Sequence, residues 1–279
     1  MLAAGRTRSF EFFPPKSDDE ARVLDATLAD LVPLAPSFVS VTYRGGAESR
    51  QRTFDLVTRI QRDGAMTAMA HLICVGHTRR AMADVLNRFL EAGVANVMAL
   101  GGDVPDDGSE HASEFDHAID LVELTREVGD FSVGVAAHPQ GHPRSANRAD
   151  DRRYLAEKLA LADFAVTQFF FRADDWSTLV DELAELGVSK PVLPGIMPVT
   201  TLSGIARMAV MGAAVPAELV ARLEAANERG GAAAVRAAGI EAATELSAEL
   251  LVRGAPGLHF YTLNRSTATR EIHRALFER

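Results

Sequence analysis

The chain has 279 residues, 47% of them hydrophobic, and carries a formal net charge of −9 at pH 7. This acidic balance argues against a general nucleic-acid binder, and no apolar run reaches the roughly 18 residues that a transmembrane helix needs. The segment from Met1 to Arg6 lacks the apolar core of a signal peptide, and the single cysteine, Cys74, excludes an intrachain disulfide. We therefore expect a cytoplasmic protein with one domain over residues 1–279 and neither nucleic acid nor membrane as a partner.

Short apolar strands recur at intervals of about 30 residues, and a helical pattern follows each of them. The expected strands are Thr7–Phe13, Phe38–Thr42, Thr67–His71, Asn96–Leu100, Ser132–Ala137, Phe164–Thr167, Pro191–Gly195 and Leu258–Tyr261. The expected helices are Asp18–Leu34, Arg50–Asp63, Thr78–Ala92, His117–Val128, Arg148–Ala162, Ala173–Leu186 and Ser266–Phe277. The Ala-rich segment Thr201–Arg253 should hold two or three helices, broken at Pro216 and at Gly230-Gly231.

Repeated strand–helix units of this length indicate an α/β fold of the (β/α)8 TIM-barrel type, with extra helices before the eighth strand. A doubly wound open sheet is the alternative. No Gly-x-Gly-x-x-Gly run follows a strand and no P-loop is present, so the sequence lacks the common nucleotide-binding signatures of open sheets.

The run Ser9-Phe10-Glu11-Phe12-Phe13-Pro14-Pro15 places a carboxylate at the carboxyl end of the first strand. The alternation predicts a strand, and the prolines end it because they cannot donate ladder hydrogen bonds. Burial among three phenylalanines is expected to raise the pKa of Glu11. A carboxylic acid that stays protonated near neutral pH can act as a general acid. The alternative is a structural Glu that pairs with a nearby Arg.

The other strand ends carry polar or backbone-permissive residues as well. They are Thr42 and Tyr43, His71, Gly101-Gly102-Asp103, His138 and His142, Thr167-Gln168, Pro194-Gly195 with Met197, and Tyr261 to Arg265. Chemistry in TIM barrels gathers at the carboxyl ends of the strands, so this set indicates an enzyme.

Three other classes of site are disfavoured. His138 and His142 are four residues apart, but the prolines and glycine between and beside them predict a loop, so we expect no metal. No Gly-x-Ser-x-Gly elbow of a hydrolase occurs. A Schiff-base lyase or aldolase would need a strand-end lysine; Lys190 precedes a strand, and Lys16 is a remote candidate.

Several of these stretches together resemble the methylenetetrahydrofolate reductase family. The matching stretches are SFEFFPP (Ser9–Pro15), FVSVTY (Phe38–Tyr43), AHLIC (Ala70–Cys74), ALGGDVP (Ala99–Pro105), TQFFF (Thr167–Phe171), PGIMPV (Pro194–Val199) and HFYTLNR (His259–Arg265). They occur in order over nearly the whole chain, and the combination is specific although no single stretch is.

The resemblance implies reduction of 5,10-methylenetetrahydrofolate to 5-methyltetrahydrofolate with electrons from a nicotinamide, in a monomer or small homo-oligomer. Glu11 matches the general acid that protonates the folate and opens the methylene bridge to an iminium. Asp103 and Gln168 match residues that hold the pterin ring, and Arg265 matches a ligand-contacting arginine. On the cofactor side the matching or equivalent positions are Thr42, Tyr43, His71, His138, His142 and Lys158.

Most of the family uses bound FAD as a hydride relay, and this chain departs from the flavin-binding pattern. Gly101 stands for an Arg, His138 for a Tyr, Tyr154 for an Asn, Glu157 for an Arg, and Arg44 for a Gly, while Gly204 and Met208 replace a Gln and an aromatic residue. Arginine forks suit the FAD diphosphate, so their loss weakens that site.

We therefore expect a flavin-free branch in which NADH or NADPH takes the vacated region and passes hydride directly to the folate. Arg44, His138 and Arg152 or Arg153 are candidates to hold the dinucleotide. The alternatives are the same reaction through bound FAD and, more remotely, a folate-binding protein without turnover.

Overall fold

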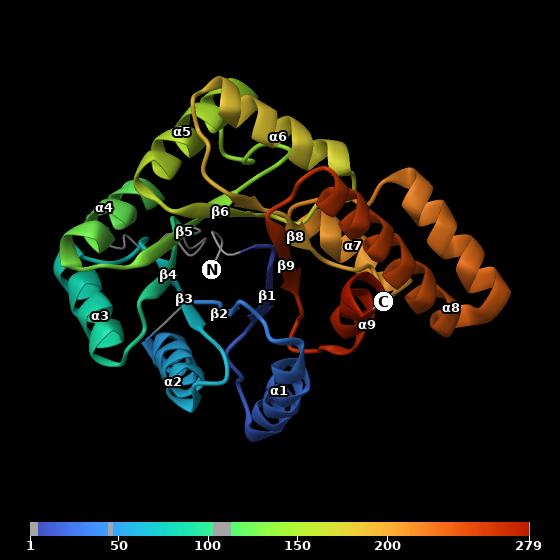
Figure 1. The fold of residues 1–279 in the computed structure, drawn as a ribbon, viewed down its shortest axis with the longest axis horizontal. Coiled ribbons are helices and arrows are strands. Elements are labelled where there is room, and N and C mark those ends of the chain that lie inside the picture. Colours follow the sequence, from blue (N-terminus) through green and yellow to red (C-terminus); the bar gives the residue numbers. More distant parts are fainter. Residues whose placement is uncertain (1–4, 44–46, 103–112, 279) are drawn as a thin grey trace.

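The strands of the computed structural model, which describes residues 5–43, 47–102 and 113–278, form one parallel sheet. Its order is β7-β6-β5-β4-β3-β2-β1-β9-β8, and the sheet wraps into a nearly closed barrel (Figure 1). The strands are β1 (Thr7–Phe12), β2 (Phe38–Val41), β3 (Ala68–Ile73), β4 (Asn96–Leu100), β5 (Ser132–Ala137), β6 (Phe164–Thr167), β7 (Val192–Leu193), β8 (Gly195–Ile196) and β9 (Gly257–Tyr261). The expected TIM-barrel fold is confirmed.

The seventh expected strand is divided in two. Pro194 has no N–H to donate, so β7 ends before it and pairs with β6, while β8 begins after it and pairs with β9. The barrel closes through this break, where Gly195 lies against neighbouring backbone. A Cβ at this glycine would lie 2.3 Å from the Thr167 carbonyl oxygen and 2.6 Å from Cε2 of Tyr261. Only glycine fits this junction.

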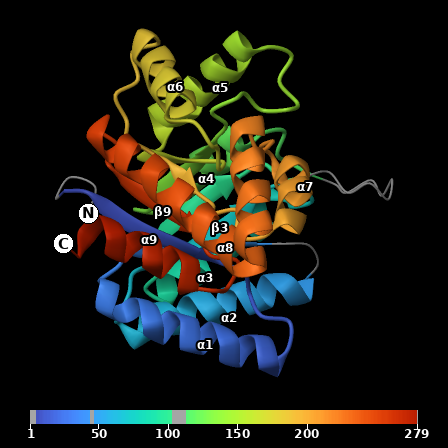
Figure 2. The ribbon, with the colours of Figure 1, turned by 90° about the vertical axis from the view of Figure 1, so that its right-hand side faces the viewer.

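Helices surround the barrel (Figures 1 and 2). They are α1 (Asp18–Leu31), α2 (Ala47–Asp63), α3 (Arg79–Glu91), α4 (Ala118–Val128), α5 (Arg148–Leu161), α6 (Ala173–Glu185), α7 (Leu202–Met211), α8 (Ala217–Val252) and α9 (Thr267–Phe277), with a 3-10 turn η2 (Val32–Leu34). The side chains of Ser17, Thr78, Asn147 and Thr201 accept from backbone N–H groups at the starts of α1, α3, α5 and α7, which satisfies donors that have no intrahelical partner. The expected helix that follows β2 begins three residues earlier than predicted, at Ala47.

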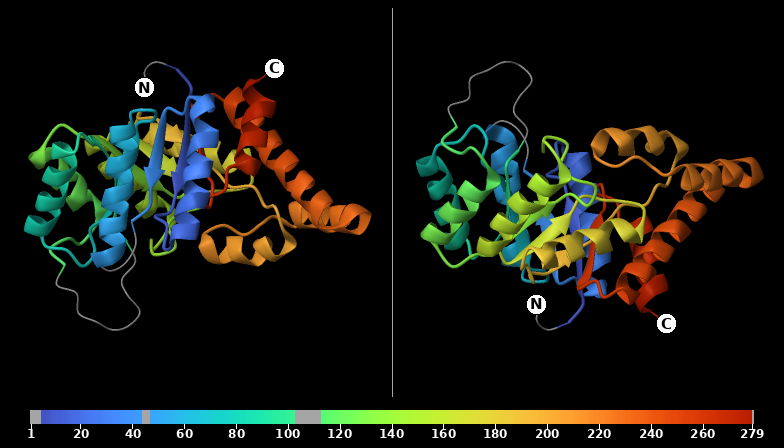
Figure 3. Two further views of the ribbon diagram at one scale, coloured as in Figure 1. Left: turned by 90° about the horizontal axis from the view of Figure 1, so that it is seen from below. Right: turned by 90° about the horizontal axis from the view of Figure 1, so that it is seen from above.

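The segment before the last strand forms α7 and the long helix α8. Pro216 precedes α8, and the helix is interrupted at Gly230 and Gly231, where Gly231 has a φ of 60°. The two parts of α8 lie at an angle to each other (Figure 3). These are the breaks that the sequence predicts, and they account for the helices added to the barrel.

The two faces of β1 carry different side chains. Phe10 and Phe12 are fully buried on the outer face among residues such as Leu24 and Leu31 of α1. Glu11 points to the inner face, because successive side chains alternate across a strand. The expectation that Glu11 is buried among phenylalanines is therefore wrong for Phe10 and Phe12, and its neighbours include imidazoles on β3 and β9. Among the described helices, none combines the length and the apolar character needed to cross a membrane.

Candidate active site

Glu11 lies between two histidines inside the barrel. Its Oε2 is 3.5 Å from Nε2 of His71 on β3 and 3.5 Å from Nε2 of His259 on β9. The Glu11 side chain is 12% exposed, whereas both imidazoles are buried. Burial lowers the pKa of His71; the Glu11 charge raises it in part, and His259 lowers it further. The structure thus pairs one carboxyl with two imidazoles at the carboxyl end of β1.

The HFYTLNR motif on and after β9 contributes other residues to this site besides the predicted Arg265. His259 and Tyr261 alternate with Phe260, and Phe260 stacks on Phe10 on the outer face, with 5.3 Å between ring centroids. The Tyr261 hydroxyl donates to the Thr167 carbonyl at 2.7 Å. Burial, and secondarily the Glu11 charge, raises the pKa of Tyr261 well above its ordinary value. The sequence placed Tyr261 among the strand-end residues but gave it no role, and His259 was not singled out, although strand alternation alone places both on the inner face.

The loop after β9 is tied to the end of β1. The Thr262 hydroxyl donates to the Glu11 carbonyl at 2.6 Å. The amide of Asn264 accepts from the Phe13 N–H at 2.7 Å and donates to the Phe13 carbonyl at 2.9 Å. Asn264 has a φ of 59°, a left-handed conformation that Asn tolerates better than most residues. These bonds hold the strand end that carries Glu11 in place.

Thr42 and Tyr43 follow β2, as expected, but make different contacts. The Thr42 hydroxyl is buried without a hydrogen-bond partner among the described residues. The Tyr43 hydroxyl lies 3.1 Å from Nε2 of His77, and the Arg50 guanidinium lies 2.8 Å from the same nitrogen. Burial, and then the Arg50 charge, lowers the pKa of His77. Arg50 and His77 are cofactor-side candidates that the sequence did not single out.

His138, His142 and Lys158 gather at the carboxyl end of β5. The two imidazoles meet edge to face with 4.5 Å between centroids. Burial lowers the pKa of His138 to about 4, with further lowering by His142 and Lys158. Lys158 donates to the Ala136 carbonyl at 3.2 Å, and burial lowers its pKa as well. His138 is therefore neutral at physiological pH.

Arg152 braces the loop after β5. Its buried guanidinium donates to the carbonyls of His138 and Pro139 at 2.9 and 2.6 Å, to Asp151 at 2.5 Å and to Glu182 at 2.6 Å. Four of its five N–H groups are thus bound within the protein. The neighbouring Arg153 is exposed and pairs with Asp150 at 3.0 Å. Of these two dinucleotide candidates, Arg152 is a structural residue.

The expected folate-side residues have three different outcomes. Gln168 follows β6, and its amide donates to the Met211 carbonyl at the end of α7 and accepts from the Phe169 N–H, both at 3.0 Å. Arg265 follows β9 and is exposed, and its guanidinium has no partner among the described residues. Asp103 lies outside the residues that the structure describes, as does the cofactor candidate Arg44.

Arg144, from the loop between β5 and α5, reaches the end of β4. Its guanidinium donates to the Gly102 carbonyl at 3.0 Å. A cation thus lies beside the end of β4. At this strand end the chain has Gly101 in place of the arginine that is usual in the family whose motifs it resembles. The chain positions of residues 101 and 144 are too far apart for this to be read from sequence.

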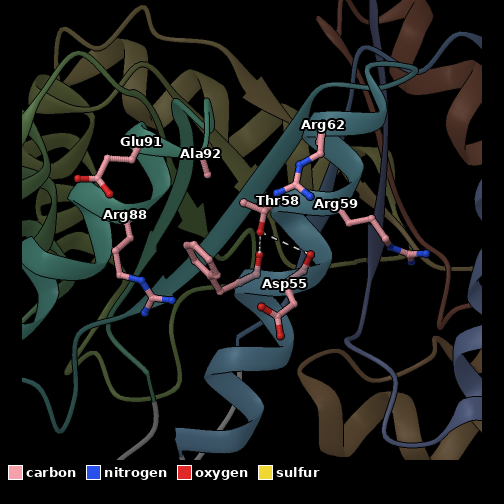
Figure 4. Close-up of a pocket in the computed structure, with 8 residues that line it drawn as sticks. Asp55, Thr58, Arg59, Arg62, Arg88, Glu91 and Ala92 are labelled. Carbon is pink, nitrogen blue, oxygen red and sulfur yellow. Dashed lines mark hydrogen bonds between the residues drawn. The ribbon is translucent and has the colours of Figure 1, made fainter.

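Two surface grooves lie apart from Glu11. One, of about 490 Å³, is lined by Asp55, Thr58, Arg59 and Arg62 of α2 and by Arg88, Glu91 and Ala92 at the end of α3 (Figure 4). Because barrel helices run antiparallel to the strands, residues late in α2 and α3 lie toward the opposite end of the barrel from Glu11. The second, of about 500 Å³, lies between α6 and α8. Within the described ranges, no three His, Cys, Asp or Glu side chains are arranged to hold a metal ion.

Comparisons with known proteins agree with the motif resemblance. A family model described as methylenetetrahydrofolate reductase matches residues 2–276. The chain is 32% identical to the 5,10-methylenetetrahydrofolate reductase of Pectobacterium carotovorum over 96% of this chain and 89% of that protein. It is 35% identical to methylenetetrahydrofolate reductase (NADH) 1 of Arabidopsis thaliana, over 92% of this chain and 46% of that longer protein.

Solved structures show the same fold at low identity. An uncharacterized Clostridium thermocellum protein that binds two copies of 5-methyl-5,6,7,8-tetrahydrofolic acid aligns with a TM-score of 0.63 at 12% identity, over 99% of this chain and 95% of that one. Dihydropteroate synthase from Xanthomonas albilineans aligns with a TM-score of 0.53 at 15% identity, over 99% and 92%. With the barrel, the motifs and the match over residues 2–276 in agreement, this chain belongs to the methylenetetrahydrofolate reductase family.

Proposed function

We propose that this chain reduces 5,10-methylenetetrahydrofolate to 5-methyltetrahydrofolate, with Glu11 as the general acid and NADH or NADPH as the hydride donor. The observation that carries the proposal is the Glu11 carboxyl on the inner face of the barrel, 3.5 Å from two imidazoles. This is the strand end at which TIM-barrel chemistry takes place. Family membership supports the reaction, and the printed name of the Arabidopsis relative supports NADH as a donor.

In this reaction the proton of Glu11 goes to a folate nitrogen, and the carbon–nitrogen bond of the bridge breaks with its electron pair remaining on that nitrogen. The bridge carbon becomes an N5 iminium. Hydride, with two electrons, adds to this carbon, which becomes the methyl group, and the nicotinamide is oxidised. Asp103 would stabilise the cation, Gln168 would hold the pterin, and Arg265 would attract an anionic part of the folate.

For the dinucleotide we propose the surface formed by Thr42, Tyr43, His71, His138, His142 and Lys158. The groups at β5 fit the diphosphate of FAD poorly. Arg152 is bound to loop carbonyls and carboxylates, Lys158 donates to Ala136, and His138 is neutral. A diphosphate needs donors that are free to turn toward it. NAD(P)H carries a diphosphate as well, so its diphosphate would also need donors other than these groups. The departures from the flavin-binding pattern, such as Gly101 and Glu157, are what support direct hydride transfer from the nicotinamide in a ternary complex, without flavin.

The second candidate is the same reaction through bound FAD. The position of Arg144 favours it, because the guanidinium at the Gly102 carbonyl brings a cation back to the end of β4. Arg50, 2.8 Å from His77, adds a second cation near the end of β3. These two arginines would have to replace the family arginines that the sequence lacks.

The visible absorbance of the purified protein and its NADH oxidation with methylenetetrahydrofolate, without added flavin, test the proposal. Turnover without flavin bands supports direct transfer. Flavin bands near one per chain would assign the protein to the FAD-dependent class. Folate binding without turnover under either condition would leave a folate-binding protein, and the proposed reaction would be wrong.

A further inference from the structure

The histidine on β9 has two defined hydrogen-bonding contacts, one on each ring nitrogen. Nδ1 of His259 lies 2.8 Å from the hydroxyl of Ser9, and Nε2 lies 3.5 Å from Oε2 of Glu11. Both His259 and Ser9 are fully buried, so water does not compete for these contacts. Ser9 and Glu11 share the inner face of β1, and Ser9 is one step deeper in the barrel. The three side chains form a row from Ser9 to Glu11.

We propose that the Ser9 hydroxyl fixes His259 as the tautomer protonated at Nε2, and that this N–H holds Oε2 of Glu11 so that the transferable proton resides on the other carboxyl oxygen. This inference rests on the proposed reductase function. His259 is a positioning residue in this scheme, because it acts on Glu11 and not on the folate.

The Ser9 hydroxyl has one proton and two acceptors within reach, and the shorter of these two contacts favours the proposed arrangement over its reverse. In the reverse arrangement, Nδ1–H donates to Ser9, and the Ser9 hydroxyl donates to the Leu258 carbonyl at 3.3 Å. That length exceeds the usual range of an O–H···O hydrogen bond, about 2.5–3.0 Å. In the proposed arrangement the Ser9 hydroxyl donates to Nδ1 over 2.8 Å, a normal length. The proton of His259 is then on Nε2 and faces Oε2 of Glu11 over 3.5 Å, a contact longer than the usual N–H···O range of about 2.7–3.2 Å, which leaves room for the two groups to draw closer when Glu11 becomes a carboxylate.

His71 contacts the same oxygen from the opposite side. Its Nε2 is 3.5 Å from Oε2, without hydrogen-bond geometry, and has no hydrogen-bond partner within the described chain. Among the described residues, the titratable groups that interact with the Glu11 carboxyl include His71 on β3 and His259 and Tyr261 on β9. With two imidazoles at Oε2, the proton that leaves Glu11 comes from Oε1, and the electron pair stays on a carboxylate that Nε2–H already stabilises.

Two substitutions separate this role from packing. His259→Gln keeps an N–H donor that can reach Glu11, whereas His259→Leu has similar bulk and no donor. We expect kcat to fall about 10²-fold in the Leu variant, the usual effect of removing one donor that stabilises developing charge, and less than about tenfold in the Gln variant. The limb of the pH–rate profile on which activity falls as Glu11 loses its proton should move to higher pH in the Leu variant only, because a donor to the carboxylate favours ionisation. If the Gln and Leu variants have the same kcat and the same position of this limb of the pH–rate profile, the inference is overturned.

Nitrogen-15 NMR of labelled histidines reads the tautomer without any turnover, and the His259→Gln spectrum assigns the signal. We expect protonation at Nε2 in the unmodified protein, and a mixture of tautomers in Ser9→Ala, which removes a single oxygen. Protonation at Nδ1 in the unmodified protein would overturn the inference even if the enzyme is active. A protein that fails to reduce methylenetetrahydrofolate would instead overturn the proposed function, while the tautomer would still decide the hydrogen-bond arrangement.

Discussion

Two groups of histidines in this barrel have opposite surroundings. His71 and His259 face the carboxyl of Glu11, at 3.5 Å each. His138 faces His142, Lys158 and the Arg152 guanidinium, all of which oppose a positive charge on its ring. The Glu11 charge partly offsets the lowering of the pKa of His71 by burial, whereas the surroundings of His138 keep that ring neutral down to about pH 4. The same residue type thus lies beside a carboxyl on β3 and β9 and beside cationic groups at the end of β5.

The sharpest test of the contrast between these two groups of histidines is the substitution Glu11→Gln. The amide keeps the shape and loses the acid, so we expect kcat to fall about 10²- to 10⁴-fold, the usual contribution of general acid catalysis. Folate binding, measured by titration calorimetry, should remain. Glu228→Gln, an exposed change on α8, is the matched control and should keep full activity. Unchanged turnover in Glu11→Gln would show that Glu11 is not the general acid. The contrast between the two groups of histidines would then have no catalytic meaning.

At β5, Arg152→Met should affect stability. Breaking a buried ion pair leaves carboxylates and carbonyls without their donor, and such a loss costs about 3–5 kcal/mol in the free energy of unfolding. Urea unfolding measures it. The adjacent Arg153→Met removes an exposed pair that is worth less than about 1 kcal/mol. Equal effects of the two substitutions would show that Arg152 does not brace the loop.

The neutral state of His138 predicts a pH dependence of stability. An unfolded chain takes up this proton near pH 6.5, whereas the folded chain does so near pH 4. The unfolded state therefore binds more protons between these values, and the free energy of unfolding falls as the pH drops from 6.5 to 4. His138→Gln should remove about 2 kcal/mol of this fall, allowing for partial solvent exposure. His117→Gln, at an exposed position, should leave the slope unchanged; an unchanged slope in His138→Gln would contradict the prediction.

The most local of these changes is Asn264→Ala, at the loop that holds the end of β1. It removes both hydrogen bonds to Phe13 and places a residue without a polar side chain at a φ of 59°. We expect a loss of about 1–3 kcal/mol in stability, together with a lower kcat because the end of β1 carries Glu11. Asn264→Gly accepts the backbone conformation and lacks only the amide. A Gly variant as active as the unmodified chain would show that the bonds to Phe13 do not position Glu11.

Much of the barrel could be predicted from local patterns. Apolar alternation marked the strands, and Pro216 and Gly230-Gly231 marked the breaks in the segment before the last strand. The division at Pro194 was missed, because the residues on both sides are apolar and the consequence of a missing N–H depends on which strands lie beside it. His71 was assigned to a strand end, but β3 continues to Ile73 and places it level with Glu11.

The sequence by itself determined the (β/α)8 barrel, the family and the place of Glu11 at the carboxyl end of the first strand, because strand periodicity and strand-end motifs are local properties of the chain. Only the tertiary structure decided which side chains surround Glu11. His71 and His259 are separated by most of the chain and meet because β1 lies between β2 and β9 and the sheet curves into a barrel. Likewise, only folding showed that Arg152 braces a loop and that Arg144 reaches the end of β4, since long side chains find their partners across segments that sequence spacing does not relate.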